Sequence, residues 1–131
     1  MNILKRTELP AHRLPGRIIQ KAVGNDAASA SERMTMGYAR YSAESGPMEP
    51  HHHAEEIAFI LSSENGWLRY GPAKDNLPHR ILLEPGMILH VPALEWHVFE
   101  YSTGGMMDIV FFYGQVDNIR SEEILGAAGA R

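Results

Sequence analysis

The chain has 131 residues, of which 44% are hydrophobic and 21% charged, and its formal net charge is −4. This composition predicts one soluble domain, because no apolar run of about 18 residues could span a membrane and no basic stripe is available for nucleic acid. The chain lacks cysteine and a recognisable secretory leader, so any metal must be held by nitrogen and oxygen ligands, and we expect a cytoplasmic location.

Strand signals recur about every ten residues, each as a short run of β-branched, aromatic and aliphatic side chains bounded by Gly, Pro, Asn or Asp. Many short strands with turns between them predict an all-β sandwich or barrel. The runs cover residues 17–23, 34–42, 56–62, 67–71, 79–83, 87–91, 97–101 and 107–113.

Turn residues separate these runs. Glu64-Asn65-Gly66 predicts a hairpin turn, because Asn and Gly tolerate positive φ. In Glu84-Pro85-Gly86, the proline presets φ for a tight turn, and the glycine is expected in the left-handed conformation. Thr103-Gly104-Gly105 predicts a further loop.

Two segments do not look like strands. Residues 25–33 are small and polar and predict a loop or one weak helical turn, whereas residues 117–126 could begin a short C-terminal helix, capped by Asn118 or Ser121. We therefore expect a single domain over residues 1–131, with an irregular N-terminal arm (1–33), a barrel core (about 34–113) and a tail (114–131).

The run His51-His52-His53 is the most informative segment for function. On an extended chain, His51 and His53 point to the same side and His52 points away. Two imidazoles about 7 Å apart along the backbone can bind one ion, and a following carboxylate adds an oxygen ligand. Strict alternation would give that role to Glu55, whereas a turn or bulge after His53 would present Glu56, and both remain open here.

A second segment adds another histidine at a defined spacing. Gly86 is followed after five residues by Pro92, and Pro92 is followed after four residues by His97. Together with His51-x-His53, this arrangement resembles the paired motifs of the cupin superfamily, G(x)5HxH(x)3-4E(x)6G and G(x)5PxG(x)2H(x)3N. The resemblance covers about residues 34–113. It implies a double-stranded β-helix, or jelly-roll barrel, with a metal bound by His51, His53, Glu56 and His97.

The sequence departs from the cupin pattern in several places. Only two residues separate His53 from Glu56, where the pattern has three or four. Glu56 is preferred as the acidic ligand because it leads directly into an apolar strand, as the glutamate of the family does, and Glu55 is the alternative. Leu94 stands where the second motif has glycine, and Tyr101 stands where it has asparagine.

Polar side chains on the inward face of the strands would line a ligand cavity. Arg40 could bind an anionic substrate if it points inward, or lie on a solvated face if it does not. His90 could line the pocket or be a hydrogen-bonded core residue, and Trp96 could pack the rim beside His97. The candidate pocket residues are Tyr38, Arg40, Arg69, His90, Trp96 and Tyr101, with Tyr70, Asp108 and Tyr113 as further possibilities.

The resemblance implies one divalent ion, either Fe, Mn, Ni or Zn, and a small-molecule substrate. The leading hypothesis is a metal-dependent enzyme with an oxygenase-type reaction on a small oxygenated metabolite. Alternatives are an isomerase or epimerase, a decarboxylase, a lyase, or a non-catalytic module that binds a sugar or acid. We expect no nucleic-acid or membrane partner. Because single cupin domains commonly exchange N-terminal strands, residues 14–23 predict a homodimer.

Overall fold

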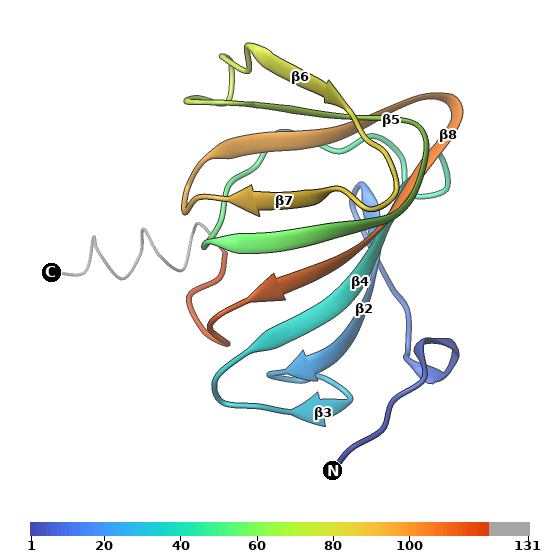
Figure 1. Ribbon diagram of the computed structural model, residues 1–131, viewed down its shortest axis with the longest axis vertical. Coiled ribbons are helices and arrows are strands. Elements are labelled where there is room, and N and C mark those ends of the chain that lie inside the picture. Colours follow the sequence, from blue (N-terminus) through green and yellow to red (C-terminus); the bar gives the residue numbers. More distant parts are fainter. Residues whose placement is uncertain (121–131) are drawn as a thin grey trace, which may run out of the picture.

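We describe residues 1–120 of the chain, as the computed structural model defines them (Figure 1). No helix in this range is long and apolar enough to cross a membrane. The elements are η1 (Arg6–Glu8), β1 (His12–Leu14), β2 (Arg17–Gly24), β3 (Ser29–Ala30), β4 (Thr35–Ser42), β5 (Glu56–Gly71), β6 (His79–Leu82), β7 (Ile88–Val91) and β8 (Trp96–Tyr113).

The strands form one hydrogen-bonded sheet in the order β1-β2-β4-β8-β5-β6, with β3 beside β2 and β7 beside β5. The strands β5 and β8 are the longest, at 16 and 18 residues, and pair antiparallel along most of their length. The first part of β5 also pairs with β7 and its last part with β6. Figure 1 shows the sheet curling round on itself, which gives the all-β jelly-roll barrel that the sequence predicted.

The predicted hairpin at Glu64-Asn65-Gly66 is wrong, because β5 runs straight through it and both of its halves pair with β8. The register shifts between Glu64 and Gly66, where Asn65 has a φ of +49°. The predicted loop around Gly104 likewise lies within β8, where that glycine has a φ of +78°. Positive φ therefore absorbs extra residues in a bulge here and does not reverse the chain.

The predicted tight turn at Glu84-Pro85-Gly86 is confirmed. Gly86 has a φ of +91°. The amide of Met87 donates to the carbonyl of Glu84 at 3.2 Å. This turn delivers the chain into β7.

Alternation along the strands places the core inside the curl of the sheet. On β5, Ala58 and Ile60 are fully buried, whereas Ile57 and Phe59 face outward and are 48% and 37% exposed. The inward side chains of four strands and one loop pack together and exclude water, which supplies the main stabilisation. The core consists of Ile19, Ala39, Tyr41, Ala58, Ile60, Leu68, Leu83, Phe99, Met107, Ile109 and Phe111.

The segments outside residues 34–113 also join the sheet. Strand β2 pairs antiparallel with β4 of the same chain, so the segment expected to exchange between subunits is paired internally, and the homodimer stays a prediction. Of the expected C-terminal helix, residues 117–120 are not helical, and Arg120 forms a β-bridge with His53. Residues 121–126 of that helix lie outside the described residues.

Candidate metal centre

Three histidines meet at one end of the barrel. His51 and His53 lie in the connection between β4 and β5, and His97 is the second residue of β8. The amides of His51 and His97 each donate to the carbonyl of the other, at 3.0 and 2.9 Å. The carbonyl of His53 accepts a hydrogen bond of 2.8 Å from the amide of Leu94. Backbone hydrogen bonds therefore fix the spacing of the three side chains.

The three imidazole rings converge on one point. One nitrogen from each of His51, His53 and His97 lies within 4.8 Å of the others. The Nε2 atoms of His53 and His97 are only 3.0 Å apart. His52 has turned away, as the alternation predicted, and stacks on Trp96 with ring centroids 3.9 Å apart.

Backbone carbonyls select the tautomer of these histidines. The Nδ1 atom of His53 lies 2.7 Å from the carbonyl oxygen of Ala54, and that of His97 lies 2.8 Å from the carbonyl oxygen of Glu95. Nδ1 of His51 makes a longer contact, 3.4 Å, with a backbone carbonyl. A carbonyl oxygen can only accept, so each Nδ1 carries the proton and each Nε2 presents a lone pair to the centre.

Burial keeps the imidazoles neutral. Loss of solvation, with the neighbouring His97 and His53, lowers the pKa of His51 to about 3. Burial and the neighbouring His53 lower the pKa of His97 to about 4. At neutral pH these two rings are therefore uncharged, which is the form that binds a metal.

The close approach of two Nε2 atoms is the observation that fits a metal. If both Nδ1 atoms carry protons, two lone pairs face each other at 3.0 Å with no hydrogen between them. A hydrogen between the two Nε2 atoms would have to sit on a ring that already carries a proton on Nδ1, and such a ring is a charged imidazolium. The lowered pKa of His97 disfavours that form. A cation between the two nitrogens removes the repulsion. Two nitrogens bound at right angles to one ion, at about 2.1 Å each, would lie about 3.0 Å apart.

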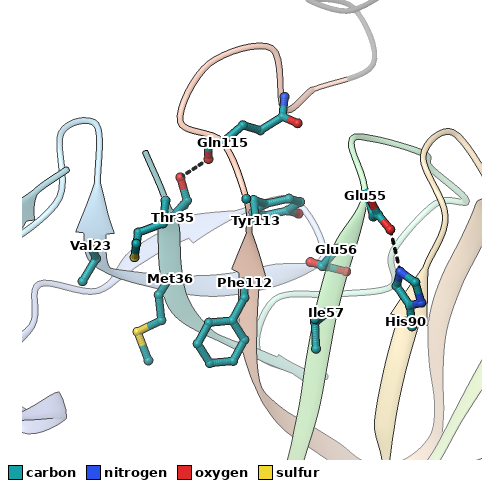
Figure 2. Close-up of a pocket in the computed structure, with 12 residues that line it drawn as sticks. Val23, Thr35, Met36, Glu55, Glu56, Ile57, His90, Phe112, Tyr113 and Gln115 are labelled. Carbon is teal, nitrogen blue, oxygen red and sulfur yellow. Dashed lines mark hydrogen bonds and ion pairs between the residues drawn. The ribbon is translucent and has the colours of Figure 1, made fainter. Parts of the chain in front are cut away.

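Glu56 and Glu55 point to opposite faces of the sheet. Glu56 begins β5, faces inward, and places Oε1 3.7 Å from Nε2 of His53. Glu55 lies outside and accepts a hydrogen bond of 2.6 Å from Nε2 of His90, an interaction drawn in Figure 2. The carboxylate that accompanies the histidines is thus Glu56. It stands slightly apart from the tight group formed by the three imidazoles.

Tyr113, the last residue of β8, is the partner of Glu56. The two residues are opposite each other in the β5–β8 register, and Figure 2 shows their side chains next to one another. The Tyr113 hydroxyl donates to the Glu56 carboxylate, and its ring packs edge-on against His53 with centroids 5.4 Å apart. Burial raises the pKa of Glu56, and burial with the adjacent Glu56 raises that of Tyr113.

The structure does not bring four of the expected pocket residues to the histidines. Tyr38 and Arg40 lie on the outer face of β4, where Tyr38 lies under the guanidinium of Arg6 and Arg40 pairs with Asp108 at 3.9 Å. Their inward neighbours on β4 are Gly37, Ala39 and Tyr41. Arg69 pairs with Glu100 at 3.5 Å, and exposed His90 pairs with Glu55.

Trp96 and Tyr101 also lie outside the group of three imidazoles. Trp96 holds His52 by stacking, as described above. The Tyr101 hydroxyl contacts the carbonyl oxygens of Ser42 and Gly46, at 2.8 Å each. It therefore ties down the connection that carries His51.

A cleft lies on the outer side of the barrel end and not over the three imidazoles. It measures about 700 Å³ and follows the ends of β4, β5 and β8. Figure 2 shows Met36, Ile57 and Phe112 pointing to the same side, away from the side chains of Glu56 and Tyr113. The cleft is therefore mainly an apolar groove of the outer face.

Comparisons with known proteins place this architecture. No family model matches the chain, and no curated protein matches its sequence. A protein from Planctomyces limnophilus is 18% identical, with a TM-score of 0.68 over 89% of this chain and 91% of that chain. The polyketide cyclase RemF from Streptomyces resistomycificus is 21% identical, with a TM-score of 0.63 over 86% of this chain and 78% of that chain.

A third solved structure is larger than this chain. Hydroxypropylphosphonic acid epoxidase from S. wedmorenis is 16% identical, with a TM-score of 0.61 over 86% of this chain and 58% of the epoxidase. These matches show that the chain shares its β-barrel fold with these proteins, and the histidine triad is consistent with the cupin resemblance of the sequence. At these identities the likeness concerns the fold alone. The triad itself is a group that could bind a metal ion.

Proposed function

We propose that the chain is a metal-dependent enzyme that acts on a small oxygenated metabolite, with an oxygenase-type reaction. The observation that carries the proposal is that one nitrogen from each of three histidines converges, while the Nδ1 atoms of His53 and His97 face backbone carbonyls at 2.7 and 2.8 Å. Two fold neighbours are named as enzymes, a polyketide cyclase and an epoxidase, and this supports an enzymatic role.

His51, His53 and His97 would hold one divalent ion, Fe, Mn, Ni or Zn, and Glu56 would add an oxygen ligand. A bound ion would supply Lewis-acid or redox chemistry at any position that these ligands leave open. A structural site, in contrast, would be closed by protein ligands.

The surrounding residues have separate tasks in this proposal. Tyr113 donates to the Glu56 carboxylate and so orients the oxygen that faces His53. Phe99 and Tyr41 pack together with centroids 4.5 Å apart and keep water away from the inner side of the site. The neutral imidazoles bring no charge that would repel a cation.

Elemental analysis of untagged protein tests the metal centre. We expect about one ion per chain in the wild type and in a His52→Ala control, because His52 points away from the site. His97→Ala should lose the metal while keeping the far-ultraviolet circular dichroism of the wild type. Equal metal content in His97→Ala and wild type would contradict the assignment.

Oxygen uptake separates the reaction classes. An oxygenase loaded with ferrous iron should consume dioxygen when a panel of small hydroxy, oxo and phenolic compounds is added. Product formation without oxygen uptake would indicate an isomerase, a decarboxylase or a lyase instead. Binding of a panel compound without any turnover would favour the non-catalytic module.

A further inference from the structure

Arg17 is an inward cation that the metal centre does not explain. It is the first residue of β2 and shares its face with Ile19, which is part of the core. Strand β2 pairs with β4 such that Ile19 lies opposite Ala39. Two residues earlier, Arg17 therefore lies level with buried Tyr41 on the inner face.

A backbone hydrogen bond also places Arg17 next to the segment that leads to the centre. The amide of the preceding residue, Gly16, donates to the carbonyl of Ser45 at 3.1 Å, so Arg17 begins β2 beside the connection that carries His51.

Arg17 also lacks a counterion within residues 1–120. Four other arginines there have one, among them Arg6, which pairs with Asp108, and Arg13, which pairs with Glu44. The one hydrogen bond found for the Arg17 side chain in this range is to the carbonyl of Pro15, at 3.2 Å. Most of its five N–H donors remain available, and a half-buried cation without an anion is unfavourable.

The charges around the centre favour an anionic ligand. A divalent ion held by three neutral histidines and the Glu56 carboxylate keeps one positive charge, and Arg17 adds a second. A neutral ligand would leave both charges uncompensated in a partly buried space. A ligand with one anionic group next to a second oxygen could face Arg17 and the three histidines at once.

We propose that Arg17 binds the carboxylate of the substrate, and that the substrate is a small hydroxy or oxo acid whose second oxygen faces the three histidines. This inference rests on the proposed metal centre and names the substrate class for it. The planar fork of a guanidinium matches the two oxygens of a carboxylate, which fixes both position and orientation.

Calorimetric titration of zinc-loaded protein tests the proposal. The probes are glycolate, neutral ethylene glycol and methylphosphonate. We expect wild type to bind glycolate at least tenfold more tightly than ethylene glycol. Arg17→Gln should weaken glycolate binding about tenfold to hundredfold and leave ethylene glycol binding within about twofold. Arg17→Lys, which keeps the charge without the fork, should fall between the two.

Arg13→Gln is the matched control, because Arg13 lies on the neighbouring strand β1 and pairs on the surface with Glu44. It should bind glycolate as wild type does. Equal glycolate affinity in Arg17→Gln and wild type would overturn the proposal, as would no glycolate binding by wild type. Tighter binding of methylphosphonate than of glycolate would overturn the carboxylate assignment.

A second measurement needs no variant. Phenylglyoxal modifies accessible arginines, and peptide mapping reports each site separately. Glycolate should protect Arg17 but not Arg13 in zinc-loaded wild type, and equal modification of Arg17 with and without glycolate would contradict the proposal. If wild type binds no zinc, the metal centre is wrong, and protection of Arg17 in the zinc-free protein still decides whether Arg17 binds the carboxylate.

Discussion

Arg6 and Asp108 form a two-point ion pair although 102 residues separate them in the sequence. Nη1 and Nη2 of Arg6 donate to the two carboxylate oxygens of Asp108 at 2.6 and 2.5 Å. The Asp108 side chain is 7% exposed, and the Arg6 guanidinium also lies 4.3 Å from the centroid of the Tyr38 ring. This pair attaches the N-terminal segment to the outer face of β8.

Asp108→Asn should lower the free energy of unfolding by about 2 kcal/mol, because two charge-assisted hydrogen bonds of a buried carboxylate are weakened. Arg13→Met, which removes an ion pair whose side chains are 63% and 58% exposed, should change it by less than about 0.5 kcal/mol. Urea unfolding of both variants provides the comparison. Equal effects would show that the Arg6–Asp108 pair contributes no more than a surface ion pair.

The two adjacent glutamates offer a matched test of the acidic ligand. Glu56→Gln should weaken metal binding about tenfold or more, because the carboxamide is a poorer ligand than the carboxylate. Glu55→Gln should leave metal affinity within about twofold, since that side chain pairs with His90 outside the barrel. Competition with a chromophoric chelator measures both. A larger effect of Glu55→Gln would exchange the two roles.

The metal-free protein should lose stability as the pH falls below about 6.5. Burial lowers the pKa of His51 to about 3 and that of His97 to about 4 in the folded state. Unfolded histidine has a pKa of about 6.5, so between these values the unfolded state binds more protons. The loss is at most about 1.4 kcal/mol per pH unit for each histidine. Glu56 has the opposite effect on the pH dependence of stability. Because burial raises its pKa in the folded state, the folded protein loses stability through this group as the pH rises above about 4.5.

His51→Leu isolates the histidine contribution. In the presence of a chelator, the free energy of unfolding of this variant should fall less between pH 7 and pH 5 than that of wild type. His52→Leu should keep the wild-type slope, because His52 lies outside the converging group. Identical slopes for His51→Leu and wild type would show that the lowered pKa does not contribute to stability.

Leu94 is held in a conformation that suits glycine. Its φ is +63°, and its amide donates to the carbonyl of His53 at 2.8 Å. Leu94→Gly and Leu94→Ala both remove the side chain, but only glycine relieves the backbone strain. Leu94→Gly should therefore be more stable than Leu94→Ala by about 1 kcal/mol.

The neighbouring Ala93 provides the control for Leu94, because its φ is not positive. At this position Ala93→Gly should reduce stability by roughly 0.5 kcal/mol through the added freedom of the unfolded chain. Thermal unfolding of the three variants gives the order. If alanine were as stable as glycine at position 94, the strain would be negligible.

The strands were predictable because their apolar runs pack on one core, but their connections were not. The dipeptide Asn65-Gly66 is as suitable for a bulge as for a hairpin, and the pairing partner decides between them. Strands β5 and β8 were therefore expected as four pieces. Whether Asn65-Gly66 forms a bulge or a hairpin depends on β8, which lies about 40 residues further along the chain and pairs with both halves of β5.

The positions of the site residues were predictable to different degrees. The shared side of His51 and His53 followed from alternation along the chain, and the addition of His97 followed from the resemblance to the cupin motifs. The choice of Glu56 depended on the break in the extended chain before β5. The sequence left the facing of Arg40 open and named Tyr38 and Arg40 as pocket candidates, because the inward set of β4 begins with the small residues Gly37 and Ala39 and gives little apolar signal.

Arg17 was missed although its signal was present in the sequence. It lies two residues before Ile19 on a predicted strand and therefore shares the inward face of that residue. The strand was interpreted as an exchanging arm, and its polar inward side chain received no role. Strand parity beside a core residue would have identified it.

The paired amides of His51 and His97 imply that the centre is assembled by folding itself. Chelation should then remove the metal without releasing these amides to rapid hydrogen exchange. In this respect the protein differs from a zinc finger, in which the ion creates the fold. A site of fixed spacing selects its ion by size and coordination preference, so the metal found in the isolated protein should also reflect which ions the cell supplies.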